Sequence, residues 1–552
     1  MTSTDVREIE WQFDALDLRP VQRWLAEPGG WADAVELRIA AAGSESHIDL
    51  YLDTDDWRFH RAGYALRIRR PPRRARGGEA TLKALASAGA AEPGLRRRRE
   101  VSEQLEHSDP AALASVGGLI GERVRAVAGT KPLLPLFEIR TRRRVFSLEG
   151  DGIPAAEIAL DETAIHPTDG TSPARMRRVE IELPERAVAS LEPFVERLRT
   201  ACGLQPAGLS KYEAGLLSAD LRAPGPESFG ATTIDPNAPI GAVAIAVLRR
   251  HFSALLAHEP GTRLGDDVEE LHVMRVVSRR LRAALSLFAE VLPPDAARLR
   301  DELGWIADAL GGVRDLDVQL EQLDGWLGEL PQADREPLAA LRRLLEAKRR
   351  DARAALLEAL DSRRYEAFVS RFGRTLRARP RRLAGPAALP ARAVAPDLLQ
   401  SRFRKLRVRG DRIGAGSDPS DYHRLRIDAK RLRYALEFLA DVYPEQTPPL
   451  VKRIVALQDL LGRHQDAEIA IGRLRTLVTE HADELQPTTI FAMGEIAERY
   501  RQTMTALRAH FPPVYARVKG RSWKSLRKLL EQERPEARDG RADADRTPPV
   551  TE

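Results

Sequence analysis

The sequence near the N-terminus reads "REIEWQF" over residues 7–13, with two glutamates two positions apart in an apolar and aromatic run. In an extended strand, alternate side chains point to the same side. Glu8, Glu10 and Gln12 would therefore share one face, and the apolar residues between them would share the other. The stretch predicts a strand that carries two carboxylates and an amide on one face.

Similar segments continue to about residue 217. They alternate apolar and polar residues, and Gly, Pro or Asp separates several of them, which is typical of strands. The segments are "HIDLYLDT" (47–54), "YALRIRR" (64–70), "EATLKAL" (79–85), "RRREVSEQL" (97–105), "EIRTRRRVFSL" (138–148), "AAEIALDE" (155–162) and "RRVEIEL" (177–183). Helical patterns interrupt them around 109–127 and 186–201. The region predicts an antiparallel barrel or sheet with packed helices.

The polar faces of these strands carry mostly paired charges of one sign. Glu180 and Glu182 share a face, as do Arg67 and Arg69, and Lys83 is one of only ten lysines in the chain. A solvated face would explain any single strand. Across seven strands, faces that converge around a polar cavity fit better, provided that opposite charges pair there. Several arginines with a glutamate cluster suit a polyphosphate with Mg²⁺ or Mn²⁺.

The ordered series of motifs resembles the CYTH domain, the triphosphate tunnel metalloenzyme fold. The motifs are "EIE" (8–10), "YLDT" (51–54), "LRIR" (66–69), "LK" (82–83), "EIALD" (157–161), "VEIEL" (179–183) and "LSKY" (209–212). The resemblance implies an eight-stranded antiparallel tunnel barrel that binds a triphosphate with Mg²⁺ or Mn²⁺. Relatives include inorganic triphosphatases, RNA triphosphatases, thiamine-triphosphatases and some adenylyl cyclases.

The resemblance also implies roles for individual residues. The acidic metal ligands would be Glu8, Glu10, Glu180 and Glu182. The substrate-binding residues would be Arg67, Arg69, Lys83, Arg98, Arg142, Arg144 and Gln12. Glu100, as a general base that orients water, and Lys211 would be catalytic.

Gln12 departs from the pattern that the family's first strand usually shows, E-x-E-x-K. An amide hydrogen-bonds a phosphate oxygen but supplies no charge. A lost charge-assisted contact weakens binding by roughly 1.5–3 kcal/mol. With Gln12 at this position, binding of metal and anion is still expected. Whether the tunnel hydrolyses its substrate or is catalytically weakened stays open.

The chain becomes helical after a Pro-, Gly- and Ser-rich stretch, and the helical half contains a repeat. "HVMRVVSRRLRAAL" begins at His272 and "HRLRIDAKRLRYAL" begins at His423, which is 151 residues later. "LGGVRDLD" from Leu310 and "LGRHQDAE" from Leu461 show the same offset. One offset that aligns two motifs predicts a duplicated helical unit.

These signals predict an α+β region followed by an all-α region. The expected segments are a barrel domain over 6–217, a linker over 218–239, a helical domain over 240–530 and a disordered tail over 531–552. The helical domain would hold two four-helix units, at about 240–376 and 397–530.

Each copy of the repeated helix carries an apolar face and an opposite basic face. The basic residues are His272, Arg275, Arg279, Arg280 and Arg282 in the first copy, and His423, Arg426, Lys430, Arg431 and Arg433 in the second. Charge runs are usually solvated faces, but this run lacks interspersed Glu and recurs with its histidine, which favours an anion site. The repeats resemble the CHAD domain, which implies helical bundles whose basic surface binds inorganic polyphosphate.

The composition limits the remaining possibilities. The formal net charge of +6 is too small to indicate a nucleic-acid partner, and the basic helices have few aromatics for stacking bases. A single cysteine, Cys202, fits a reducing compartment. The sequence has no run of about 18 uninterrupted apolar residues, so it predicts no membrane span. We therefore expect a cytoplasmic protein, associated with polyphosphate granules if its helical half binds that polymer.

Two functions of different classes stay open at this stage. The first is a metal-dependent triphosphatase whose helical half recruits polyphosphate. The second is a non-enzymatic polyphosphate-binding protein whose tunnel only binds anions. RNA 5′-triphosphate processing is a weaker alternative, and the barrel motifs do not separate adenylyl cyclase chemistry from hydrolysis.

Overall fold

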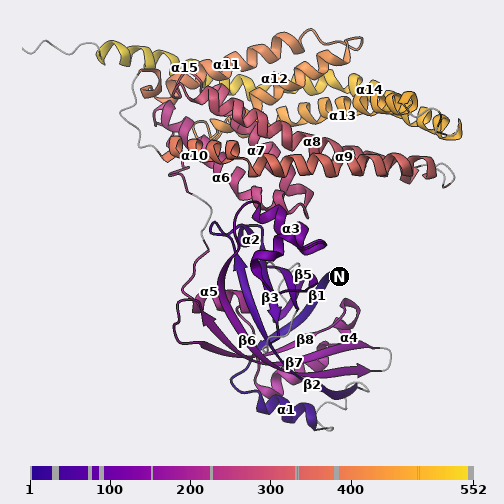
Figure 1. The fold of residues 1–552 in the computed structure, drawn as a ribbon. Coiled ribbons are helices and arrows are strands. Elements are labelled where there is room, and N and C mark those ends of the chain that lie inside the picture. Colours follow the sequence, from indigo (N-terminus) through magenta and orange to yellow (C-terminus); the bar gives the residue numbers. More distant parts are fainter. Residues whose placement is uncertain are drawn as a thin grey trace, which may run out of the picture. The chain divides into compact units, whose positions relative to one another are not determined.

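A computed structural model of the chain forms two compact units (Figure 1). The first comprises residues 1–226 and 257–267, and the second comprises residues 227–256 and 268–552. The residues that the structure describes are 3–27, 37–71, 77–85, 93–150, 153–223, 228–329, 332, 335–377, 385–480, 483, 485 and 487–544.

The first unit is a closed antiparallel barrel of eight strands. The strands are β1 (Ser3–Asp14), β2 (Leu37–Asp53), β3 (Tyr64–Arg70), β4 (Gly78–Ala84), β5 (Leu95–Leu105), β6 (Leu134–Gly150), β7 (Ile153–Pro167) and β8 (Ala174–Glu182). They pair in the order β5-β4-β3-β2-β6-β7-β8-β1, and β1 also pairs with β5, which closes the barrel. A two-residue strand, β9 (Gln205–Pro206), pairs with the end of β1. The predicted tunnel barrel is confirmed.

Two apolar cores cover the outside of this barrel. The outward face of β1, with Trp11 and Phe13, packs with α1 (Arg19–Ala26) and α4 (Val188–Cys202). On the other side, β3, β4 and β5 pack with α2 (Arg58–Arg61) and α3 (Leu119–Ala128). The outward apolar face therefore leaves Glu8, Glu10 and Gln12 pointing into the barrel, as the alternation in "REIEWQF" predicts.

An aromatic cluster packs with α5 (Lys211–Ser218) inside the barrel. Tyr51 stacks on Phe137 with ring centroids 4.9 Å apart, and Tyr212 lies 5.7 Å from Tyr51. A Cβ added at Gly215 would lie 2.1 Å from Phe137 Cε2, so glycine lets α5 approach β6 closely. A capping box on Ser210 fixes the start of α5, and Lys211 is its first residue. This local structure directs Lys211 into the barrel.

The second unit consists of long helices around a large apolar core, with a second, smaller apolar cluster. The first five are α6 (Ile240–Leu264), α7 (Val268–Leu287), α8 (Ala296–Glu329), α9 (Arg335–Asp361) and α10 (Arg363–Arg377). The other five are α11 (Ala391–Gly410), α12 (Pro419–Phe438), α13 (Thr447–Glu480), α14 (Pro487–Val518) and α15 (Arg521–Ala544). Helix α6 belongs to this unit up to Leu256, and its end belongs to the barrel unit.

The repeat seen in the sequence is a repeat of helices. Helix α12 begins and ends 151 residues after α7, and α13 begins and ends 151 residues after α8. The described part of each half holds five helices rather than the four expected. One residue separates α9 from α10 and two separate α14 from α15, so the fourth helix of each half is broken in two.

Helix α15 continues beyond residue 531, where we expected a disordered tail. Glu533 accepts a hydrogen bond from Tyr443 Oη at 2.8 Å, which ties this part of the helix to the core. The helix runs on to Ala544. Residues 545–552 of the expected tail lie outside the described residues.

Within the described part of the chain, one helix, α6, is long and apolar enough by length and composition to cross a membrane. In the structure, 56% of its most apolar stretch is buried against protein. Phe252 and Leu255 of this helix are fully buried in the core of the helical unit. Packing inside the protein accounts for its apolar character.

Candidate active site and anion-binding groove

A polar cavity of about 160 Å³ lies inside the barrel. Its lining includes eleven of the residues that the sequence predicts for the site: Glu8, Glu10, Gln12, Arg67, Arg69, Lys83, Arg98, Glu100, Glu180, Glu182 and Lys211. They come from β1, β3, β4, β5, β8 and α5, so the fold brings together residues that are far apart in the sequence.

Lys83 lies at the centre of one charged cluster in this cavity. Its Nζ donates to Glu10 Oε1 at 3.0 Å, contacts Glu8, and lies 3.6 Å from Glu100 Oε2. Arg98 Nη2 donates to the same oxygen of Glu10 at 2.6 Å. Burial alone would raise the pKa of Glu10, but the two cations outweigh it and lower that pKa to about 2. Glu10 is therefore ionised across the physiological pH range.

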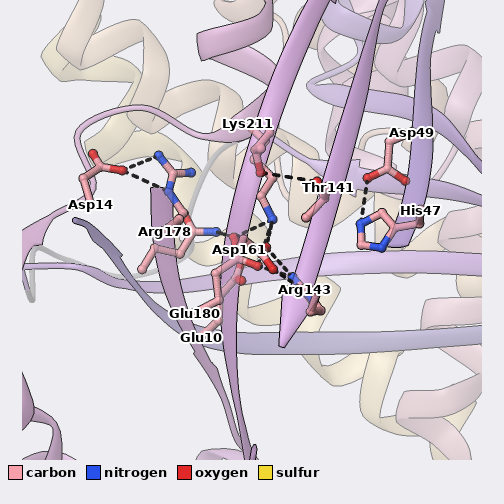
Figure 2. Close-up of polar contacts among 12 residues, drawn as sticks. Glu10, Asp14, His47, Asp49, Thr141, Arg143, Asp161, Arg178, Glu180 and Lys211 are labelled. Atoms are coloured by element: carbon pink, nitrogen blue, oxygen red, sulfur yellow. Dashed lines mark hydrogen bonds and ion pairs between the residues drawn. The ribbon is translucent and has the colours of Figure 1, made fainter. Parts of the chain in front are cut away.

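Lys211 and Arg143 form a second charged cluster, which Figure 2 shows. Lys211 Nζ donates to Asp161 Oδ2 at 2.6 Å and to Glu180 Oε2 at 3.0 Å. Arg143 binds both oxygens of Asp161 at 2.8 Å and donates to Glu180 at 2.6 Å. Opposite charges thus neutralise one another in the barrel, as the sequence analysis expected of converging faces.

Asp49 positions two of the predicted phosphate-binding arginines. Arg69 donates from Nε and Nη2 to the two oxygens of Asp49, at 2.8 and 3.1 Å, and Arg67 Nη1 lies 3.8 Å away. Asp49 is fully buried; burial raises its pKa, and the two arginines overcome this to hold it well below the usual value. His47 lies beside it, with Nε2 at 3.6 Å from Asp49 Oδ2 (Figure 2).

Three carboxylates form a row across neighbouring strands at one level of the cavity. Glu10 of β1 is directly opposite Glu182 of β8, and Glu182 is directly opposite Glu157 of β7. No ion pair of Glu157 or Glu182 occurs among the described residues. Glu8 is close by, and burial together with the charge of Glu10 raises its pKa to about 8. Like charges placed opposite one another are destabilising unless a cation joins them.

This row has the chemistry that hard divalent cations prefer, because Mg²⁺ and Mn²⁺ take carboxylate oxygens. In the described part of the chain, no group of three or more Asp, Glu, His or Cys side chains has the arrangement of a metal site. The carboxylates nevertheless provide the oxygen ligands that Mg²⁺ or Mn²⁺ requires, and Glu8, Glu10, Glu157 and Glu182 would hold the ion. Glu180 differs from the prediction, because it is buried and already engaged by Lys211 and Arg143.

Arg142 and Arg144 are exposed, and neither lines the main cavity. The neighbouring Arg143 lines it instead, so the expectation that Arg142 and Arg144 bind substrate there is wrong about the face. The apolar residues Phe137 and Ile139 on the same strand point into the barrel, where they join the aromatic cluster. Strand alternation predicts correctly which residues of β6 share a face. Because Phe137 and Ile139 pack in the apolar cluster, the inward face is the one that carries Arg143, not the one that carries Arg142 and Arg144.

Sequence reasoning missed several residues that the barrel brings together. His47 and Asp49 are two positions apart in "HIDLYLD" (47–53), and this spacing places their side chains on the same face of a strand. Glu157 and Asp161 share a face in "EIALD" (157–161), but the pattern assigns no role to either residue. Arg143 was hidden in a run of three arginines that offers a guanidinium to either face.

The helical unit contains a second polar feature, a groove of about 440 Å³ where α7 and α12 run beside each other. We call it the α7/α12 groove. Its charged lining is Arg279, Arg282, Arg300, Asp301, Arg402, Lys430 and Arg431. Equivalent residues of the two repeats, Arg279 and Lys430, both lie in it.

The basic residues predicted on the repeated helix fall into two groups. Arg280 and Arg433 both pair with Glu437, at 3.0 and 3.4 Å, and lie over the ring of Tyr434.

Other basic residues of the repeated helix have partners of their own. Arg275 pairs with Asp315 at 3.2 Å, His423 hydrogen-bonds Gln465, and Arg431 is 3.9 Å from Asp428. His272 has a buried Nδ1 with no hydrogen-bond partner in the described part of the chain. The residues with no ion pair among those described are Arg279, Arg282, Arg426 and Lys430.

Two family models match the chain, and together they define its class. A CYTH domain matches residues 31–215, which covers most of the barrel unit. A CHAD domain matches residues 246–475, within the helical half. The chain therefore carries a match to a CYTH domain followed by a match to a CHAD domain, as the sequence motifs indicated. No curated protein matches the chain.

Solved structures resemble each half separately. The CHAD domain from the plant Ricinus communis is 29% identical, covering 54% of this chain and 97% of that one, with a TM-score of 0.43. PptA from Streptomyces chartreusis is 23% identical, covering 50% and 100%, with a TM-score of 0.42. A Hippeastrum protein described as a putative adenylyl cyclase with a dominant triphosphatase activity is 18% identical, covering 39% and 98%, with a TM-score of 0.29.

Proposed function

We propose that the barrel binds inorganic triphosphate or a related triphosphate together with a divalent cation and hydrolyses it, while the helical unit binds inorganic polyphosphate. CYTH domains bind triphosphate substrates, and the family includes triphosphatases. The observation that carries the proposal is the ordered charge of the cavity. Most of its cations are paired with buried carboxylates, whereas Glu157 and Glu182 have no ion pair among the described residues.

The charge balance of the cavity supports a bound divalent cation. Six cationic and seven acidic side chains line it. A cavity with no excess of positive charge does not by itself attract an anion that carries several negative charges. A Mg²⁺ or Mn²⁺ ion on the row of Glu10, Glu182 and Glu157 would supply the missing positive charge and polarise phosphoryl oxygens.

The cationic residues would bind the phosphate chain. Arg67 and Arg69 are held by Asp49, and Arg143 is held by Asp161, so their guanidinium groups are oriented before the substrate arrives. Oriented guanidinium groups bind phosphate oxygens in a bidentate manner with little reorganisation. Lys83 and Lys211 would add point charges as their carboxylate partners engage other cations.

Glu100 would orient the attacking water. It lies on β5 at the cavity wall, and its Oε2 is buried with no hydrogen-bond partner among the described residues. Lys83 and Arg67 lie 3.6 and 3.9 Å from its carboxylate. A carboxylate that retains an open acceptor can take a hydrogen bond, and then a proton, from water beside the phosphorus atom.

The α7/α12 groove would bind polyphosphate through its unpaired cations. Arg279, Arg282 and Lys430 line it and have no ion pair in the described part of the chain, so they are available to an anion. Binding of a phosphate polymer by such residues releases counterions and depends steeply on salt, as in nucleic-acid binding. The CHAD match is consistent with this role.

The test measures phosphate release from inorganic triphosphate with Mg²⁺ or Mn²⁺, by wild type, Glu10→Gln and Glu100→Gln. We expect turnover in wild type, loss in both variants and loss of wild-type turnover on chelation. Wild type that binds triphosphate without turnover would support the alternative, a polyphosphate-binding protein with a weakened tunnel. Faster turnover of a nucleoside triphosphate to a cyclic product would instead favour cyclase chemistry.

A further inference from the structure

The charged lining of the α7/α12 groove includes one lysine among arginines. Lys430 is partly buried on α12 and lines the groove with Arg279 and Arg282 of α7. Arg279 is the equivalent residue in the first repeat, 151 positions earlier. The two repeats therefore present arginine and lysine at matching places.

Lysine and arginine differ in one respect that matters here. A guanidinium stays protonated under all ordinary conditions, whereas an ammonium group gives up its proton when burial and like charges disfavour it. Among the cations of the groove, Lys430 alone is able to change its charge near neutral pH. The chain uses lysine rarely, with ten in 552 residues.

The surroundings of Lys430 are almost entirely cationic. Helix α7 contributes Arg275, Arg279 and Arg282, and α12 contributes Arg426, Arg431 and Arg433. Helix α11 contributes Arg402, and α8 contributes Arg300 and the one carboxylate of the groove lining, Asp301. Asp301 is 77% exposed and lies 3.8 Å from Arg300. No ion pair of Lys430 occurs among the described residues.

We propose that Lys430 makes polyphosphate binding in the groove dependent on pH, because the bound phosphate chain recruits a proton to this side chain. The proposal rests on the proposed function of the helical unit. It goes beyond that function by naming one residue as the proton-linked element and by fixing the direction of the pH effect.

The direction follows from the charges. Burial, and then the arginines Arg279, Arg426 and Arg433, lower the pKa of Lys430 to about 7 in the free protein. A phosphate chain beside it supplies the negative charge that the groove lacks and raises this pKa. Affinity is then fully developed below pH 7 and falls as the pH rises above 7, by about tenfold per pH unit for one linked proton.

The experiment measures the affinity of the full-length protein for long-chain inorganic polyphosphate at several pH values from about 6 to 8.5, at constant ionic strength. Wild type should lose affinity above pH 7, and Lys430→Arg should keep it. Calorimetry in buffers of different ionisation enthalpy should show uptake approaching one proton per binding event near pH 8 in wild type. At the same pH, Lys430→Arg should take up about one proton fewer per binding event than wild type.

Lys452→Arg is the matched control, because Lys452 is an exposed lysine on α13 outside the groove. It should keep the wild-type pH dependence. The histidines of the repeated helices are unchanged in Lys430→Arg, so their titration cancels in the comparison with wild type. Equal pH dependence in wild type and Lys430→Arg overturns this inference alone. Absence of polyphosphate binding at every pH overturns the proposed function of the groove as well.

Discussion

Gln12 Nε2 donates to Glu180 Oε1 at 3.4 Å, and these two residues lie directly opposite each other on β1 and β8. The same Glu180 accepts hydrogen bonds from Arg143 and Lys211. Gln12 Oε1 is buried and has no hydrogen-bond partner within the described part of the chain. The amide therefore lies beside a carboxylate that two cations already neutralise, at the position where related barrels usually carry a lysine.

The first prediction concerns the charge that Gln12 lacks. Gln12→Lys places an ammonium group at the cavity wall, where it gains a charge-assisted contact with a phosphate oxygen. Triphosphate turnover should rise by about tenfold to a hundredfold, because such a contact contributes about 1.5–3 kcal/mol. Phosphate release under saturating Mg²⁺ measures it.

Gln12→Met is the matched control, since it keeps the length of the side chain without a charge. Turnover that rises equally in both variants would show that the added charge is not the cause. A rise in turnover confined to Gln12→Lys would support a phosphate chain that passes this residue.

The second prediction separates three consecutive arginines. Arg143 reaches the cavity, whereas Arg142 and Arg144 are exposed. Arg143→Gln should weaken triphosphate binding by at least about tenfold, since it removes an oriented, charge-assisted contact. Arg142→Gln and Arg144→Gln should leave binding unchanged. Titration of triphosphate by calorimetry compares all three, and an effect of Arg142→Gln equal to that of Arg143→Gln would contradict the register of β6.

These arginines show how far the sequence determines the site. Strand alternation and the order of motifs predict the barrel, the inward face of β1 and eleven of the cavity residues. On β6 both faces carry arginine beyond Thr141, so the inward residue depends on how Phe137 and Ile139 pack with α5, which is tertiary information. Asp49 and Asp161 were missed for a related reason, because their role is to hold arginines that come from other strands.

The helical half shows the same limit. The offset of 151 residues predicts the duplication, and α7 with α12 and α8 with α13 reproduce it in the structure. The basic face was predicted as a whole. Which of its arginines stay available depends on Glu437, Asp315 and Asp428, and the sequence pattern does not assign these carboxylates to partners.

The third prediction concerns stability. Asp161 is fully buried and holds both Arg143 and Lys211. Asp161→Asn leaves two buried cations short of a counter-charge, and breaking a buried pair in this way costs about 3–5 kcal/mol. Urea denaturation of the barrel should show a loss of this size. Asp55→Asn is the control, because the pair of Asp55 with Lys131 is far more exposed and such pairs contribute about 0.2–1 kcal/mol.

The fourth prediction concerns acid. Burial, and then the charge of Arg69, lower the pKa of His47 to about 3 in the folded barrel. The unfolded chain takes up a proton on this histidine near its ordinary value of about 6.5. Between these two values the unfolded state binds more protons, so stability falls with falling pH by up to about 1.4 kcal/mol per unit.

His47→Gln should remove this slope between about pH 6 and pH 4, while stability at neutral pH changes less. Urea midpoints of wild type and variant at several pH values measure it. His107→Gln, at an exposed histidine, should retain the wild-type slope. A variant His47→Gln with an unchanged slope would show that other groups govern the acid sensitivity of the barrel.

The fifth prediction concerns the salt dependence of polyphosphate binding. Replacing Arg279 and Arg282 together by glutamine removes two cations that line the groove and have no ion pair in the described part of the chain. Each cation that neutralises a phosphate releases counterions, so the slope of log affinity against log salt should become shallower by about 0.7–0.9 per residue. Binding measured over a series of NaCl concentrations gives the slope.

Two comparisons make this test specific to the groove. Arg404→Gln with Arg453→Gln removes exposed arginines from α11 and α13 that do not line the groove, and the slope should stay as in wild type. Arg280→Gln with Arg433→Gln removes arginines that Glu437 already neutralises, and the slope should change less than for an equal number of unpaired cations. Equal losses from all three sets would point to a diffuse basic surface rather than the α7/α12 groove.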